Sequence, residues 1–157
     1  MKKIILSAFA LITFGLMSAQ ETKFGVKAGF TAQTVTVKVG GLSGTGSASG
    51  FLVGGFADFG VSDKMRFQPS VEYVAVSGNN SIEVPLLLKY SIIDKLYAIG
   101  GPGINYSLDA PTDELTVAID LGASYDITDN FIGELRYDIG LTGIKTSGIY
   151  LSAGYRF

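Results

Sequence analysis

The sequence of 157 residues contains no cysteine, no histidine and no tryptophan. Without cysteine the chain has no disulfide framework, no thiol nucleophile and no cysteine-based metal site. Without histidine it has no Ser-His-Asp triad, no imidazole general base and no imidazole metal ligand. Charged residues make up only 17% of the chain, and the net charge of −2 offers no electrostatic footprint for a nucleic acid. The sequence therefore predicts no cofactor, no metal site and no nucleic-acid partner.

Apolar residues and glycine are abundant instead. Apolar residues make up 47% of the chain, and the 21 glycines are about twice the average share. A chain this apolar and this weakly charged is not disordered. Its length predicts one compact domain.

The N-terminus has the pattern of a secretory signal peptide. Lys2 and Lys3 precede an apolar run over residues 4–17, and the small pair Ser18-Ala19 follows it. The alternative is a membrane-anchoring helix, but this run is shorter than the roughly 17–25 residues that a spanning helix needs. We therefore expect a signal peptide at residues 1–19, followed by one barrel domain at residues 20–157.

Beyond the signal peptide, apolar residues alternate with polar or small ones. Phe24, Val26, Ala28 and Phe30 take every second position, and Lys27 lies between them. This period of two is the period of a β-strand. The same alternation recurs over residues 51–61, 67–75, 82–92, 96–108, 115–127, 131–141 and 149–157. The apolar side of these eight segments carries no charged residue, which predicts an all-β fold with eight strands.

Two all-β folds fit this alternation, and they differ in which side faces inward. In a soluble barrel or sandwich the apolar side is the core, whereas in a membrane barrel it faces lipid and the polar side fills the lumen. The polar side here is rich in glycine, its positive and negative charges nearly balance, and the aromatic residues of the apolar side gather near the strand ends. These features favour the membrane barrel, because a crowded lumen needs small residues and paired charges. The charged residues that we expect to form a lumen network are Lys27, Asp58, Arg66, Glu72, Glu83, Lys89, Asp120, Glu134, Arg136, Asp138 and Arg156.

The connections predict an eight-stranded antiparallel up-and-down transmembrane β-barrel. Short polar turns at residues 62–64, 94–95 and 128–130 alternate with longer links at residues 32–50, 76–81, 109–114 and 142–148. Short turns on one rim and longer loops on the other are typical of outer-membrane barrels. The glycine-rich residues 40–50 lack the lysine and helix of a phosphate-binding loop, so we expect a flexible loop there.

Two details fit this barrel less simply. Pro69, Pro85 and Pro102 fall inside proposed strands, where we expect them to mark bulges or the true strand ends. The alternation also changes phase after Ala32, which indicates either a bulge or a strand that continues above the membrane.

Several segments resemble the PorT-like outer-membrane β-barrel family. They are Gly50–Tyr73, Ile82–Tyr90, the Gly101-Pro102-Gly103 triplet and the closing Ser152–Phe157. The resemblance implies an outer-membrane protein that the barrel-assembly machinery inserts, with Tyr155 and Phe157 of the last strand as the insertion signal. It implies no activity.

Residues with catalytic potential have simpler interpretations. Glu134 and Asp138 resemble an acid–base pair, but the basic residues expected around them favour ion pairing. Asp109, Asp113 and Glu114 have the oxygen ligands of a hard-cation site, although such clusters are usually solvated loop residues.

We therefore predict a non-catalytic integral outer-membrane protein with a side-chain-filled lumen, surface loops and a structural or surface-interaction role. Its expected partners are outer-membrane lipid and an unidentified extracellular ligand or surface partner. The alternatives are a narrow pore or small-ligand carrier in the outer membrane, and a soluble secreted binding barrel.

Overall fold

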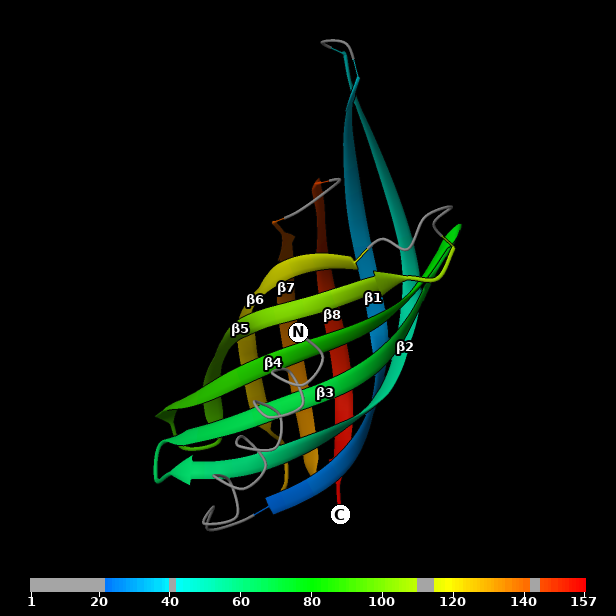
Figure 1. The fold of residues 1–157 in the computed structure, drawn as a ribbon. Helices are drawn as coiled ribbons and strands as arrows, with labels where there is room; N and C mark the ends of the chain where they lie inside the picture. The colour runs from blue at the N-terminus through cyan, green and yellow to red at the C-terminus, as the bar shows by residue number, and fades with distance from the viewer. Residues whose placement is uncertain (1–21, 40–41, 110–114, 142–144) are drawn as a thin grey trace, which may run out of the picture.

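The chain forms a closed barrel of eight antiparallel strands, joined in sequence order (Figure 1). This computed structural model describes residues 22–39, 42–109, 115–141 and 145–157, so the expected cleavage point after Ala19 lies outside the described residues. The predicted eight-stranded up-and-down barrel is confirmed. The strands are β1 (Thr22–Val39), β2 (Leu42–Ser62), β3 (Met65–Val76), β4 (Asn79–Ile93), β5 (Leu96–Ser107), β6 (Leu115–Asp126), β7 (Phe131–Gly140) and β8 (Lys145–Arg156).

The first strand closes the barrel by pairing on both of its sides. Val26 lies opposite Gly55 of β2 and opposite Tyr155 of β8. A closed ring of strands leaves no sheet edge within the barrel wall, which is what a β-structure in lipid requires because lipid offers no hydrogen bonds. Among the described residues, no helix is long and apolar enough to cross a membrane.

The two faces of the barrel wall are opposite in character. Leu121 and Phe30 point outward and are 52% and 74% exposed, whereas Lys89 and Arg136 point inward and are almost completely buried. Large apolar side chains therefore cover the outside, and charged side chains fill the inside. This arrangement contradicts the soluble alternative, in which the apolar side would be the core.

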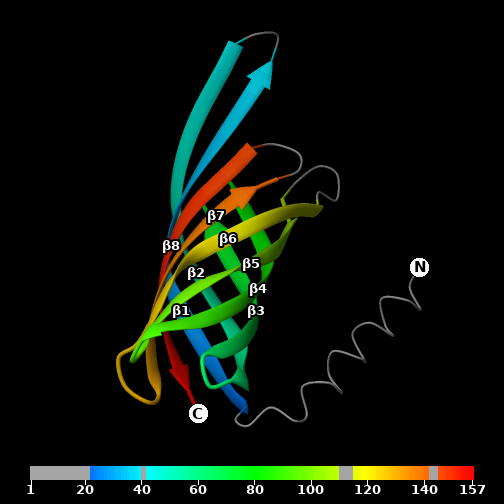
Figure 2. The same ribbon diagram turned by 90° about the vertical axis from the view of Figure 1, so that its left-hand side faces the viewer.

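A long hairpin of β1 and β2 projects beyond one rim of the barrel (Figures 1 and 2). The register between these strands continues unbroken to the pair Val39–Leu42, whereas β3 joins β2 only from Gly50 onward. The expectation of a loose link over residues 32–50 is therefore wrong, as is that of a flexible loop over residues 42–50. Of the two explanations for the phase change after Ala32, the continuing strand is confirmed.

The other connections at this rim are shorter where they are described. The expected loop at residues 76–81 is a tight turn of Ser77 and Gly78, and the φ of +85° at Gly78 suits glycine. Most residues of the expected links at 109–114 and 142–148 lie outside the described part of the chain, although residues 145–148 belong to β8. The opposite rim carries the three predicted short turns, the start of β1 and the end of β8 (Figure 2).

The three prolines lie within strands, so the expectation that they mark bulges or strand ends is wrong. The β3–β4 register runs from Pro69–Leu86 to Glu72–Glu83 without a shift, although the two positions between these pairs are skipped. Proline lacks an N–H and so removes a ladder hydrogen bond, but the pairing on either side holds the strands in register. The register shifts in the barrel lie elsewhere, at residues 60–62 of β2 and 91–93 of β4.

Candidate functional site

The inner face of the barrel carries a network of ion pairs that joins strands far apart in the sequence. It has two clusters of charged residues and, above them, a polar cavity below the rim from which the hairpin projects. We call these parts the Asp58 cluster, the Arg136 cluster and the outer mouth.

The Asp58 cluster lies nearest the rim with the short turns. Asp58 of β2 is fully buried, and its Oδ1 accepts a hydrogen bond from Arg66 Nε at 2.7 Å. Its Oδ2 lies 3.1 Å from Arg156 Nη1 and 3.7 Å from Lys89 Nζ. Arg156 also contacts Asp126, at 2.8 Å from Nη2 to Oδ2. One aspartate thus joins β2 to β3, β4 and β8.

The Arg136 cluster is built around the guanidinium of Arg136 on β7. Nη1 and Nη2 donate to the two carboxylate oxygens of Glu72, at 3.1 and 2.9 Å. Nη2 also lies 3.4 Å from Glu83 Oε2, and Nε lies 3.2 Å from Asp120 Oδ1. The Tyr150 ring centre is 4.5 Å from the guanidinium carbon. A bidentate carboxylate pair stacked on an aromatic ring fixes a planar guanidinium in one orientation.

Lys27 and Gln68 connect the two clusters. Lys27 Nζ lies 2.7 Å from Glu72 Oε1 and 3.2 Å from Glu134 Oε1. Gln68 donates from Nε2 to Glu134 Oε2 at 2.9 Å and accepts from Lys89 Nζ at 3.1 Å. The Asp58 cluster and the Arg136 cluster therefore form one continuous network.

Apolar side chains and glycines complete the packing of the lumen. Leu52, Val74 and Val76 form a buried cluster with Tyr150. Lower down, the ring of Phe56 lies against Gly25, where a Cβ atom would collide with it. Arg136 of β7 and Glu72 of β3 meet across the barrel, in agreement with an eight-stranded lumen that is just wide enough to be filled by side chains.

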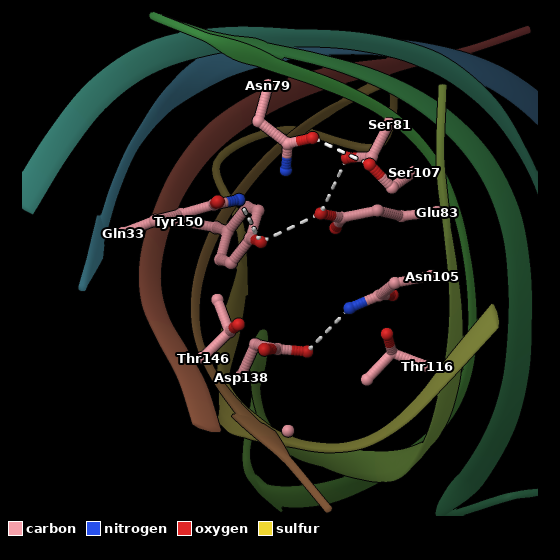
Figure 3. Close-up of a pocket in the computed structure, with 11 residues that line it drawn as sticks. Gln33, Asn79, Ser81, Glu83, Asn105, Ser107, Thr116, Asp138, Thr146 and Tyr150 are labelled. Atoms are coloured by element: carbon pink, nitrogen blue, oxygen red, sulfur yellow. Dashed lines mark hydrogen bonds between the residues drawn. The ribbon is translucent and has the colours of Figure 1, made fainter. Parts of the chain in front are cut away.

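The outer mouth is a polar cavity of about 60 Å³ (Figure 3). The residues that line it are Gln33, Asn79, Ser81, Glu83, Asn105, Ser107, Thr116, Asp138, Gly140, Thr146 and Tyr150. The two charged residues in this lining are both acidic. The cavity thus combines negative charge with amide and hydroxyl groups.

Glu83 and Tyr150 hold one side of this cavity in place. Tyr150 Oη donates to Glu83 Oε1 at 2.9 Å and accepts from Gln33 Nε2 at 2.8 Å. Ser81 Oγ donates to the same Glu83 oxygen at 3.5 Å. Glu83 also contacts Arg136, which lies below the cavity and compensates the negative charge of Glu83.

Asp138 lies on another side of the cavity and is only 3% exposed. Asn105 Nδ2 donates to Asp138 Oδ2 at 3.5 Å, the single hydrogen bond that Asp138 makes within the described part of the chain. No lysine or arginine among the described residues forms an ion pair with Asp138. Asp138 is therefore a buried carboxylate that no cation among the described side chains contacts.

The structure places all eleven residues expected in the lumen on the inner face, and Arg66 is the one that is half-buried. All of them except Asp138 form ion pairs. Glu134 contacts Lys27 and Gln68, whereas Asp138 accepts a hydrogen bond from Asn105. These separate partners fit ion pairing and hydrogen bonding rather than an acid–base pair. Sequence reasoning missed Gln68, Tyr150 and Gln33, although the phase of the alternation puts the first two on the inner face.

The other candidate residues that the structure describes lie outside the lumen. Tyr155 is on the outer face near the short turns, and its ring packs edge-on against Phe131 with 5.0 Å between ring centres. Phe157 is exposed and its backbone N–H donates to the Phe24 carbonyl oxygen at 2.9 Å. Asp109 accepts a hydrogen bond from the Asn80 backbone, while Asp113 and Glu114 lie outside the described residues. Among the residues that the structure describes, no cluster of three or more acidic, histidine or cysteine residues could hold a metal ion.

Comparisons with known proteins agree with this geometry. The profile of the outer membrane protein beta-barrel domain family matches residues 6–157. The attachment invasion locus protein Ail of Yersinia pestis, solved with a heparin analogue, is similar at 17% identity and a TM-score of 0.57 over 88% of this chain and all of that one. Neisserial surface protein A is similar at 19% identity and a TM-score of 0.54, over 87% of this chain and 98% of that one.

The N-terminal β-barrel domain of Pseudomonas aeruginosa OprF is similar at 13% identity and a TM-score of 0.52, over 87% of this chain and all of that one. At these identities the three structures share the fold with this chain. A comparison with characterised protein sequences gives no significant match.

Proposed function

Because this chain belongs to the outer membrane protein beta-barrel domain family, we propose that it serves the outer membrane as a closed, non-catalytic scaffold for surface contacts. The protein is an outer-membrane β-barrel, and its outward face suits lipid. The observation that carries the proposal is the lumen, where Arg136 joins Glu72 on the opposite part of the wall through two hydrogen bonds. Such a filled interior supports a scaffold rather than a pore.

Conductance in planar lipid bilayers tests this proposal. We expect the purified wild-type protein to give no steady open channels, because the network spans the lumen between the Asp58 cluster and the outer mouth. A matched porin preparation under the same conditions shows that insertion can be detected. Steady channels of the wild-type protein would refute the scaffold and favour the narrow pore.

The projecting β1–β2 hairpin supports the surface-contact part of the proposal. Within the described strands, residues 42–49 of β2 have no partner on β3, so this edge of the hairpin is open to other molecules. The family resemblance and the short turns at the opposite rim support an orientation with this hairpin on the cell exterior. A likeness to Ail, which was solved with a heparin analogue, fits a surface role but names no ligand for this chain.

Shortening the hairpin tests whether it is separate from the barrel. Thr36 and Thr45 lie opposite each other, so an Asn-Gly turn in place of residues 37–44 joins them in the existing register. We expect the shortened protein to fold with unchanged heat-modifiable gel mobility and unchanged stability in urea. Loss of folding would show that the hairpin belongs to the structural core and is not a free contact surface.

We further propose the subfamily of this barrel and the way in which it is inserted. We place the chain with the PorT-like barrels on the segments Gly50–Tyr73 and Ser152–Phe157. The barrel-assembly machinery then inserts the chain into outer-membrane lipid, with Tyr155 and Phe157 as the signal in the last strand. The exposed aromatic rings of Tyr155 and Phe157 support this role.

A further inference from the structure

The charge balance of the lumen fails at one place, the outer mouth. The inner face has seven carboxylates, and six of them lie within 4 Å of a lysine or arginine nitrogen: Asp58, Glu72, Glu83, Asp120, Asp126 and Glu134. The seventh, Asp138, has no such neighbour among the described residues. A buried charge without a partner is strongly unfavourable, so an ionised Asp138 calls for a positive group that the described residues do not supply.

The cavity beside Asp138 has room for such a group. Figure 3 shows the Asp138 and Asn105 side chains turned toward each other and toward the space that Glu83 faces from another wall. The remaining lining consists of amide, hydroxyl and glycine positions, with no lysine or arginine. A primary ammonium has three N–H donors and no acceptor, and the mouth offers carboxylate, amide and hydroxyl oxygens as acceptors.

The size of the cavity limits what can enter. At roughly 10–15 Å³ for each water molecule, its 60 Å³ corresponds to about four waters. This space fits an ammonium group with one or two carbon atoms, whereas a sugar ring is too large. The rest of a longer ligand would extend out of the mouth toward the hairpin rim.

We propose that the outer mouth binds the primary ammonium end of an aminoalkyl group from outside the barrel, with Asp138 as its counter-ion. Asn105 orients the Asp138 carboxylate through its hydrogen bond, and Glu83 adds negative charge while Tyr150 keeps it in place. Free alkylamines and the side chain of lysine in a polypeptide share this chemistry. The site goes beyond the scaffold role, because a closed barrel needs no ligand.

An NMR titration of the folded protein in detergent micelles tests this site. Ethylammonium chloride is the probe and ethanol is its neutral counterpart of similar shape, with ionic strength held constant by tetramethylammonium chloride. We expect ethylammonium to give saturable shifts of the Asn105 side-chain amide and the Gly140 backbone amide, and ethanol to give none. Nα-acetyl-lysinamide, titrated in parallel, tells whether a lysine side chain also enters.

Matched variants tie the binding to Asp138. We expect Asp138→Asn to weaken ethylammonium binding at least tenfold, and Asp63→Asn in the exposed β2–β3 turn to bind like the wild type. Thr116→Lys, which brings an ammonium of the chain to the cavity wall, should abolish binding and keeps the test valid if Asp138→Asn fails to fold. Equal shifts from ethanol and ethylammonium, or wild-type affinity in Asp138→Asn, would refute the site.

Discussion

Replacing Arg136 with alanine tests the lumen network most directly. Arg136 is 2% exposed and contacts three carboxylates, those of Glu72, Glu83 and Asp120. In Arg136→Ala, Glu72 keeps Lys27, whereas Glu83 and Asp120 lose the cation that they contact. Removing one partner of a buried ion pair typically lowers the free energy of unfolding by about 3–5 kcal/mol. We expect a loss at the upper end of this range, since one substitution affects three pairs.

Urea unfolding of the protein in lipid vesicles measures this loss. The eight tyrosines provide the fluorescence signal because the chain has no tryptophan, and heat-modifiable gel mobility reports the folded fraction independently. Lys64→Ala, in the exposed turn between β2 and β3, is the matched control and should change stability by less than about 0.5 kcal/mol. Arg136→Lys should fall between the two, because it keeps the charge but loses the bidentate geometry. A loss for Arg136→Ala within 1 kcal/mol of the control would refute a paired lumen.

Two further substitutions test the barrel wall. Leu121→Arg on the outer face should lower the free energy of unfolding in vesicles by about 2–4 kcal/mol if it lies at mid-bilayer depth. Val61→Arg, beside the short β2–β3 turn, should lower it by about 0–1 kcal/mol. Equal losses would contradict this depth assignment. Gly122→Ala should reduce the folded fraction on gels, because its Cβ would collide with the Leu135 carbonyl oxygen, whereas Gly133→Ala should fold normally with 3.7 Å to its nearest neighbour. Normal folding of Gly122→Ala would show that the β6–β7 wall can widen there.

The alternation of residues predicts the barrel well because each strand keeps one phase of alternation where it forms the barrel wall. Lys27, Glu72 and Arg136 are far apart in the sequence, yet the phase of each strand puts all three on the inner face. The lipid-facing side follows from the same phase, as Leu121 and Phe30 illustrate. The period of two thus predicts both the β-strands and which side of each strand faces inward.

The sequence does not reveal how partners are chosen inside the lumen. Arg136 contacts Glu72 across the barrel, a pairing that depends on the stagger of the closed ring of strands and on side-chain length. Gln68 links two clusters and is uncharged, so a search limited to charges overlooks it. That no described lysine or arginine pairs with Asp138 is visible only once the partners of the other carboxylates are known.

Irregular features of the chain are also ambiguous in the sequence. Glycine and serine in residues 42–50 are typical of loops, yet pairing with β1 makes this segment a strand. Pro69 and Pro85 are unfavourable in strands taken alone, but their neighbours on both sides hold the register. In both cases contacts between strands override the preference of single residues.

The ion pairs of the lumen network have a consequence for how the barrel assembles. Asp58 is synthesised early in the chain, whereas Arg156 is the second-to-last residue, and Lys27 meets Glu134 across 107 positions. A nascent chain held open at the seam between β1 and β8 would therefore carry bare charges that lipid does not solvate. We therefore expect electrical neutralisation and ring closure to occur as a single event, with the open chain in contact with water until β8 pairs with β1.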